Sequence, residues 1–430
     1  MSSRFLQKPG FNIKIRGEDN LYGLTQIRLR SDGNDPTLLR TKLVTDIRNK
    51  LGLSSISANY ANVYVNDDFL GFFILRDAIK SSWIESEFGE KDTKSLYKCA
   101  NYSYLTKDYS SVNCNNEDES VEDNTEFVEF LTALDKAQSA SDIEDIFEID
   151  QFLTDMALDY LFGAWGHYIY IGENYSLYKQ ANGKWKYIPN DHDYDFGINM
   201  DRVGFSYIFT DMPERTEKLL NIDYPNLSYP DWIRSHHLTD ILIFKDPSRF
   251  EKILKDLVVK VFNPATLYPH LDELKKFIKP YVEKELLDNK DVVIYNPEGL
   301  KSFTFEEWDA NSEFTSVKTQ MFFAYGLKYW ILAKYRYMCK TYQDIECDST
   351  YLDENYEYSI NKKVEFTGYT ESGSSLPGSN TKNDDNVQKQ EKNRNPVTND
   401  NDQKPRNNRN PKTNDNDQKP KINRYIKNKY

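Results

Sequence analysis

The segment Asn190–Asn199 reads NDHDYDFGIN and directly follows Lys184–Pro189, KWKYIP, whose alternating pattern predicts a strand. Aspartates occupy alternate positions in this segment, at Asp191, Asp193 and Asp195. Carboxylates this close together repel one another, and a bound divalent cation offsets the repulsion. The segment therefore predicts a metal-binding loop, and a solvated acidic turn is the alternative.

The spacing of the aspartates resembles the start of an EF-hand, but the rest of the EF-hand pattern is absent. The EF-hand pattern requires a glycine where this sequence has Phe196 and a bidentate glutamate where it has Arg202. Tyr194, Phe196 and Ile198 surround the aspartates with apolar groups, which favours a packed loop over a solvated turn. We therefore expect a metal site of another architecture.

Upstream of the loop, the first hundred residues predict a small sheet with one helix. The order is strand, strand, helix, strand, strand, over Phe11–Arg16, Leu24–Arg30, Asp35–Leu51, Tyr60–Asn66 and Phe69–Leu75. Asp35 is the predicted N-cap of the helix, Pro36 its first residue, and Gly52 ends it.

The rest of the body is mainly helical. Helices are predicted over Thr125–Ala137, Ile149–Leu161, Pro247–Val261, Leu267–Leu287 and Phe305–Asp344, the last with a break at Gly326. A further strand, at Asn174–Lys179, precedes the strand before the metal loop. In kinase-type phosphoryl transfer, an Asn from the catalytic loop and an Asp after a late strand hold Mg²⁺ on the nucleotide. Asn174 and Asp191 occur in this order.

The last sixty residues have a different composition. Between Tyr369 and Tyr425 there is no aromatic residue, and NRNPVTNDNDQKP at Asn393–Pro405 recurs at Asn408–Pro420 as NRNPKTNDNDQKP. A stacked repeat would need apolar positions, and these units have almost none. We therefore expect a disordered tail that serves as a linker or spacer.

Charge and hydropathy exclude two classes of protein. The chain has 55 basic and 68 acidic residues, a net charge of -13, which argues against a nucleic-acid partner. The mean hydropathy is -0.74, and no apolar run is long enough to cross a bilayer. Met1–Arg16 lacks the apolar run of a signal peptide, which indicates a cytosolic chain or an incomplete N-terminus.

The four cysteines form two pairs in the sequence. Cys99 and Cys114 flank a polar segment, whereas Cys339 and Cys347 lie close to the end of the helical region. Neither pair has the spacing of a zinc site. Cys99 and Cys114 are therefore interpreted as a disulfide of an exported protein, and two reduced thiols are the alternative.

Several motifs together are similar to those of the spore coat protein H (CotH) kinase family, an atypical kinase-like group, especially its fungal members. The motifs, from Phe11 to Met338, are IRLRSDGNDPTLLRTKL (Ile27–Leu43), YVNDDFLGFFILRDAIK (Tyr64–Lys80), SLYKC (Ser95–Cys99), WGHYIYIGENYSLYK (Trp165–Lys179), IPNDHDYDFG (Ile188–Gly197) and GLKYWI (Gly326–Ile331). The paired D-x-D before a late glycine, together with the Asn-Tyr strand, is the specific part of this resemblance.

The resemblance implies an α+β chain with a bilobal, atypical protein-kinase-like fold, built from a small sheet-plus-helix N-lobe and a mainly helical C-lobe. The expected boundaries are an N-lobe-like part at 1–100, a polar loop at 101–124, a helical C-lobe with the metal loop at 125–346, a boundary segment at 347–370 and the disordered tail at 371–430.

The resemblance also assigns candidate site residues. Asp191 and Asp193 match the family's metal-binding pair and Asn174 matches its asparagine, whereas Asp195 is a secondary ligand. Arg28 and Arg30 share one strand face and are candidates for phosphate contact; a solvated strand face is the alternative. Main-chain groups of Leu75 to Asp77 are expected to contact adenine. Lys98 matches a family charge to which we assign no role.

One position departs from the family pattern. The family has an Asp after the aromatic residue in the loop that matches AWGHY, and this sequence has Gly166. Glycine can neither accept a proton nor orient a hydroxyl group. His167 and Glu173 are the nearby candidates for the catalytic role.

The leading hypothesis is a CotH-type protein that binds ATP with Mg²⁺ or Mn²⁺ and phosphorylates protein Ser or Thr hydroxyls. Because of Gly166, a pseudokinase that binds nucleotide without efficient transfer is the first alternative. A cell-surface adhesion or structural protein is the second alternative, since some fungal relatives act as host-cell ligands. The family implies an extracellular or cell-surface location, with a protein substrate or surface partner.

Overall fold

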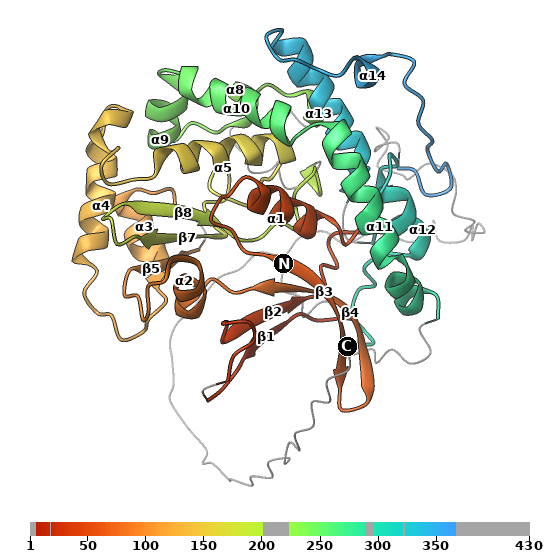
Figure 1. The fold of residues 1–430 in the computed structure, drawn as a ribbon, viewed down its shortest axis with the longest axis horizontal. Helices are drawn as coiled ribbons and strands as arrows, with labels where there is room; N and C mark the ends of the chain where they lie inside the picture. Colours follow the sequence, from red (N-terminus) through yellow and green to blue (C-terminus); the bar gives the residue numbers. More distant parts are fainter. Residues whose placement is uncertain are drawn as a thin grey trace, which may run out of the picture. The chain divides into compact units, whose positions relative to one another are not determined.

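The computed structural model describes residues 6–17, 19–100, 102–200, 223–288, 296–320 and 323–366 (Figure 1). The predicted disordered tail, 371–430, lies outside the described residues and stays a prediction. The described part is a mixed α+β structure with two four-stranded sheets, as the sequence indicated at the level of fold class.

The first sheet is antiparallel, with the strand order β1-β2-β4-β3. Its strands are β1 (Phe11–Lys14), β2 (Gln26–Arg30), β3 (Ala58–Val65) and β4 (Asp68–Asp77). The predicted order of strands and helix is confirmed. β4 is largely buried in the interior of the sheet, because both of its edges are paired and the helical part of the chain covers it.

The helix α1 (Arg40–Lys50) begins four residues after Pro36, its predicted first residue. Asp35 does accept the main-chain N–H of Arg40, at 2.9 Å, but Leu38 has a φ of 58° and interrupts the helical backbone. The whole stretch 31–41 is buried, so tertiary contacts decide its conformation and override the local capping signal. α1 lies between the first sheet and the helices (Figure 1).

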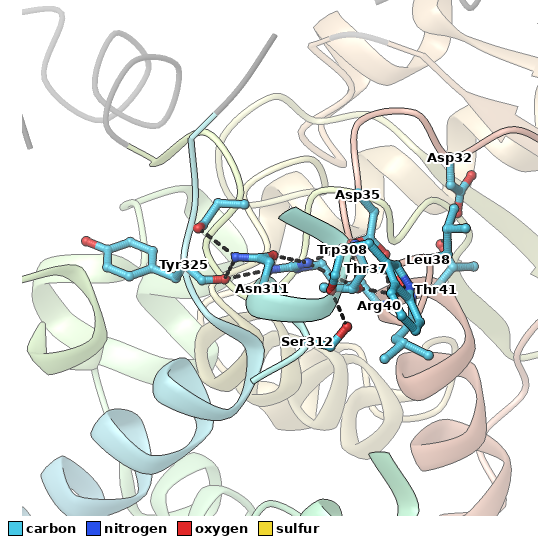
Figure 2. Close-up of polar contacts among 12 residues, drawn as sticks. Asp32, Asp35, Thr37, Leu38, Arg40, Thr41, Trp308, Asn311, Ser312 and Tyr325 are labelled. Atoms are coloured by element: carbon cyan, nitrogen blue, oxygen red, sulfur yellow. Dashed lines mark hydrogen bonds and ion pairs between the residues drawn. The ribbon is translucent and has the colours of Figure 1, made fainter. Parts of the chain in front are cut away.

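Figure 2 shows the buried polar network that fixes this stretch. One nitrogen of Arg40, Nη1, donates to Asp35 Oδ1 at 2.6 Å and to Asn311 Oδ1 at 3.1 Å, and Nη2 donates to the main-chain oxygen of Tyr325 at 2.7 Å. Trp308 Nε1 donates to the main-chain oxygen of Thr37 at 2.9 Å. Because buried polar groups are costly unless paired, these bonds hold the segment before α1 against α12 (Phe305–Asn311).

The second sheet is also antiparallel, with the order β6-β5-β7-β8. Its strands are β5 (Leu96–Cys99), β6 (Cys114–Asn116), β7 (Tyr175–Lys179) and β8 (Trp185–Pro189). The predicted disulfide joins Cys99 to Cys114 across β5 and β6. β6 and α3 (Lys107–Asn113) lie in the segment that composition alone indicated to be a polar loop.

The remaining helices cover the second sheet and extend beyond it (Figure 1). They are α2 (Ser81–Phe88), α4 (Thr125–Lys136), η2 (Ala140–Asp142), α5 (Ile149–Phe162), η5 (Tyr224–Asn226), α8 (Tyr229–Trp232), α9 (His237–Thr239), η6 (Asp240–Phe244), α10 (Ser248–Lys260), α11 (Pro264–Leu286), α13 (Leu327–Thr341) and α14 (Ser349–Leu352). α5 packs on β8 and α10, and α11 packs on α13 and β4. Within the described ranges, no helix combines the length and the apolar character needed to cross a membrane.

The single helix predicted over Phe305–Asp344 is wrong in its middle part. α12 and α13 are separate helices, with the two-stranded ribbon of β9 (Val317–Lys318) and β10 (Phe323–Ala324) between them. The break at Gly326 is confirmed, because α13 begins at the next residue. A Cβ at this glycine would lie 2.4 Å from the main chain of Phe314, so the close approach of the two segments requires glycine.

Candidate metal and nucleotide site

The aspartate loop follows β8 and is fixed by aromatic packing. Gly197 has a φ of 76°, and a Cβ there would lie 2.4 Å from the Trp330 ring, so this position requires glycine. Trp165 Nε1 donates to the main-chain oxygen of Ile198 at 2.8 Å. The packed loop that the flanking aromatic residues predicted is present.

Two arginines of the first sheet reach the aspartates of this loop. Arg76 Nη1, from β4, donates to Asp191 Oδ1 at 3.0 Å. Arg30 Nη2, from β2, lies 3.3 Å from Asp193 Oδ2 and 3.6 Å from Asp191 Oδ1. The guanidinium group of Arg30 thus bridges the two carboxylates that the sequence assigned to a metal.

The two aspartates ionise differently in this arrangement. Burial would raise the pKa of Asp191, but the charges of Arg30 and Arg76 outweigh it and hold that pKa well below its usual range. Burial and the neighbouring charge of Asp191 raise the pKa of Asp193 to about 7. A divalent cation bound to both carboxylates would favour the ionised form of each.

Two further oxygens lie beside this pair, and the sequence reasoning did not assign them. Asp32 Oδ1 and Asn34 Oδ1 are buried and have no hydrogen-bond partner within the described part of the chain. Asn34 Nδ2 donates to Asp193 Oδ2 at 3.1 Å, and Asp32 Oδ1 lies 3.6 Å from Arg30 Nε. Oxygen donors of this kind suit Mg²⁺ or Mn²⁺, so the residues present fit a hard divalent cation. The SDGND run before α1 was the signal that could have found them.

His167 lies behind the aspartate loop. Its Nε2 lies 2.7 Å from the main-chain oxygen of Asp191, and its Nδ1 lies 3.0 Å from Asp159 Oδ1. Burial would lower the pKa of His167, but the Asp159 carboxylate outweighs it and raises that pKa to about 9. The ring is buried with both nitrogens engaged. These contacts suit a residue that positions the loop, and its catalytic role stays a prediction.

Asp195 lies on the same side as His167. Its Oδ2 is 3.0 Å from His192 Nδ1, and burial raises the pKa of Asp195 well above its usual range. His167, His192 and Asp195 each offer a potential ligand atom, and these atoms lie within 4.8 Å of one another. Both nitrogens of His167 have hydrogen-bond partners, whereas His192 Nε2 is buried and has none among the described residues.

Asn174 lies directly beside the start of the aspartate loop. Its main-chain oxygen accepts the N–H of Asn190 at 2.9 Å, and its Nδ2 donates to the main-chain oxygen of Gly166 at 2.9 Å and to Glu173 Oε1 at 3.4 Å. Among the described residues, a Cβ on Gly166 would meet only Asn174 Nδ2, at 3.7 Å, which is an ordinary contact. The fold therefore brings Gly166, Glu173 and Asn174 together and leaves room for a side chain at Gly166.

The remaining predicted residues lie in the first sheet. Arg28 is opposite Arg76 in the β2–β4 ladder and is half-buried. Leu75 is paired on both sides, with β2 and with β3, and the main-chain N–H of Asp77 donates to Ser57 at 3.2 Å. The main-chain groups at Leu75 and Asp77 are thus largely engaged within the sheet, and their contact with adenine stays a prediction.

A comparison with known protein families identifies the family of this chain. The family model described as CotH kinase protein matches residues 1–289, which is more than half of the chain. The chain belongs to the CotH kinase protein family. The match covers both four-stranded sheets, the aspartate loop and the arginines that contact it. The resemblance found in the sequence motifs is confirmed.

Curated CotH relatives come from fungi and bacteria. Spore coat protein homolog 1 of Rhizopus delemar is 28% identical over 326 residues, 71% of this chain and 50% of that protein. Invasin CotH3 of the same organism is 25% identical over 330 residues, 71% of this chain and 51% of the relative. The inner spore coat protein H of Bacillus subtilis is 21% identical over 219 residues, 48% of this chain and 60% of the relative. The chain thus spans about half the length of the fungal relatives it matches.

Proposed function

We propose that this CotH-family protein binds ATP together with Mg²⁺ or Mn²⁺ at the loop after β8. The single observation that carries the proposal is the pair of aspartates, half-buried Asp191 and buried Asp193, bridged by Arg30. Such a cluster of opposite charges at the start of a loop is suited to hold a triphosphate and a cation together. In this proposal the first sheet with α1 is the N-lobe of a bilobal kinase-like fold, and the helical part with the second sheet is its C-lobe.

Each residue has a distinct role in this proposal. Asp191 and Asp193 would hold the cation, and Asn174 would contribute its side-chain oxygen at a second metal position. Arg30, once a cation replaces it between the aspartates, would turn to the phosphates, together with Arg28. The cation would neutralise the charge of the phosphate oxygens during transfer. The protein would supply the fixed geometry of these groups.

Transfer to a protein Ser or Thr hydroxyl is the activity that follows if an acceptor is oriented beside Gly166. Glu173 is half-buried in that loop, and burial together with the charge of Asp191 raises its pKa. A raised pKa suits a group that accepts and returns a proton near neutral pH. A pseudokinase that binds ATP without transfer is the alternative, because glycine supplies no carboxylate at the family's Asp position.

Calorimetry with ATP tests the proposal. Wild type should bind ATP in Mg²⁺ and bind it at least tenfold more weakly in EDTA. Asp191→Asn and Asp193→Asn should remove the effect of Mg²⁺. Asp67→Asn, an exposed change in the β3–β4 turn, is the matched control and should bind as wild type. Binding that is independent of metal and survives both loop substitutions would contradict the proposal.

An extracellular or cell-surface location is a second proposal with its own support. The structure contains two disulfides, Cys99–Cys114 and Cys339–Cys347, and the second was not predicted. Disulfides of this kind persist in oxidising compartments. Fungal relatives carry the name invasin, so adhesion to a host surface is the alternative function for this chain. Thiol titration of unfolded protein taken from its native source without reductant should find no free thiol, and four thiols would contradict this location.

A further inference from the structure

A separate pocket of about 240 Å³ lies between the first sheet and β5. Residues of β1 and β2, the segment after β4 and Lys98 of β5 line it, whereas Asp191 and Asp193 do not. Four of its lining side chains are cations: Lys14, Arg28, Lys80 and Lys98. The nucleotide role proposed above uses only Arg28 of this set.

The cations of this pocket are largely uncompensated. The side chains of Lys14, Arg28 and Lys98 make no hydrogen bond or ion pair with any other residue that the structure describes, whereas Lys80 pairs with Glu117. Burial and then the charge of Arg76 lower the pKa of Arg28 to about 10. Burial and then Arg28 lower the pKa of Lys98, and burial and then Lys98 lower the pKa of Lys80. The fold thus brings like charges close together, and no described carboxylate fully offsets their electrostatic repulsion.

The size and chemistry of the pocket define what it can hold. Its volume is below the range of about 300–1,000 Å³ of pockets that enclose a drug-sized ligand, so it suits a small anion better than a whole nucleotide. The Arg28 guanidinium is a planar donor that matches phosphate oxygens, and the lysines add point charges. The chain as a whole carries a net charge of -13 and repels anions, so this pocket is a local exception.

We infer that this pocket binds a phosphate-bearing anion through Arg28, Lys80 and Lys98, without a divalent cation. The charge of Asp191 acts on both Arg28 and Lys98, which places the pocket next to the aspartate loop. The anion belongs to the same chemical class as the phosphates of the proposed nucleotide. The two sites are nonetheless separable, because one needs a metal ion and the other does not.

Calorimetry with tripolyphosphate in EDTA at low salt tests the inference. Wild type should bind, and Lys98→Gln and Arg28→Gln should each weaken binding about tenfold. The Lys98 side chain makes no hydrogen bond or ion pair with another described residue, so its substitution should leave the melting temperature unchanged and keep the test independent of folding. Lys91→Gln, an exposed lysine outside the pocket, is the matched control. Absence of binding in wild type, or equal binding by all four proteins, would overturn the inference.

Two competition experiments identify the source of the phosphate. ATP in EDTA that displaces tripolyphosphate indicates the phosphate chain of a nucleotide, and O-phosphoserine that displaces it indicates a phosphorylated residue. Displacement by either compound supports a phosphate site. If neither compound displaces tripolyphosphate, the inference is overturned. Asp191→Asn should leave tripolyphosphate binding in EDTA intact, so a failure of the metal site and a failure of this pocket give different results.

Discussion

Arg76 Nη1 lies 3.0 Å from Asp191 Oδ1, so a buried guanidinium of the first sheet is already paired with the first aspartate of the metal loop. Arg30 completes the arrangement by contacting both Asp191 and Asp193. A divalent cation at this loop must therefore compete with a positive charge of the protein itself. Buried charges are costly without a partner, and the arginines provide that partner.

Removal of Arg30 should make the metal loop bind cations more tightly. Arg30→Gln leaves the carboxylates of Asp191 and Asp193 with one fewer positive charge nearby, so the melting temperature without metal should fall and Mn²⁺ should restore more of it than in wild type. We expect Mn²⁺ affinity to rise about tenfold, roughly 1.4 kcal/mol. Electron paramagnetic resonance of free Mn²⁺ measures this affinity. Arg16→Gln, an exposed change, is the control, and equal affinities in all three proteins would contradict the prediction.

A carboxylate at Gly166 should increase phosphoryl transfer. The backbone there does not require glycine, and Asn174 Nδ2, at 3.7 Å, is the one atom of the described part of the chain that a Cβ would contact. Gly166→Asp should therefore fold and should raise the rate by about 10²–10⁴-fold, the usual contribution of a general base. Transfer of ³²P from ATP to an acceptor protein measures the rate. ATP affinity should change little, because the new group faces the acceptor and not the phosphates.

The matched control for this experiment is Gly166→Asn, which has the same shape without a carboxylate and should transfer no faster than wild type. The competing hypothesis is that His167 or Glu173 already acts in catalysis. It expects an active wild type, little change in Gly166→Asp, and loss of transfer in His167→Ala or Glu173→Gln. If wild type and Gly166→Asp both bind ATP with metal and neither transfers phosphate, the pseudokinase alternative is correct.

Removing only one partner of the buried pair Arg48 and Asp155 should strongly destabilise the fold. Arg48 Nη1 of α1 lies 2.7 Å from Asp155 Oδ1 of α5, and both side chains are buried. Arg48→Met removes one partner and leaves Asp155 buried alone, at an expected cost of about 3–5 kcal/mol. The double variant Arg48→Met/Asp155→Leu should recover most of this loss, because no buried charge remains. Urea unfolding of Arg48→Met, Asp155→Leu and the double variant measures these changes. A loss of stability in the double variant equal to the sum of the two single losses would contradict the prediction.

The sequence predicted the first sheet well, because Phe11–Arg16 and Leu24–Arg30 alternate clearly and the turn around Asp67 and Asp68 is polar. It misplaced the start of α1 because Asp35 and Pro36 are a strong local capping signal. The contacts that override this signal come from Asn311 and Tyr325, hundreds of residues away. No local pattern contains such partners, and tertiary contacts of this kind commonly override propensity.

The residues of the candidate site were likewise predicted only where the signal lies within one short segment. Asp191 and Asp193 were found because closely spaced carboxylates are visible in one short segment. Arg76 was missed because it lies in an apolar strand, where only the β2–β4 register brings it to the aspartate loop. Asp32 was missed because its role depends on the buried conformation of the segment before α1. Functional residues that come from separate elements need the fold before they can be recognised.

Lys334 should make the stability of the protein depend on pH above neutrality. The residue is fully buried in α13, with Nζ 4.1 Å from the centre of the Tyr160 ring and 3.3 Å from the main-chain oxygen of Leu227. Burial lowers the pKa of Lys334 to about 7, against the weaker opposing charge of Asp223. An unfolded lysine has a pKa of about 10.4.

Between these two pKa values the unfolded chain binds a proton that the folded chain does not, so the free energy of unfolding falls as the pH decreases from about 10 to 7. Below the folded-state pKa both states are protonated and the penalty is constant. Lys334→Met abolishes this penalty. The stability advantage of Lys334→Met over wild type should therefore grow by about 1.4 kcal/mol for each unit by which the pH is lowered within this window. Urea unfolding at pH 7, 8 and 9 measures the difference. Lys340→Met, an exposed change in the same helix, should show no such trend. An advantage of Lys334→Met that is equal at pH 7 and pH 9 would show that the buried amine does not titrate in this range.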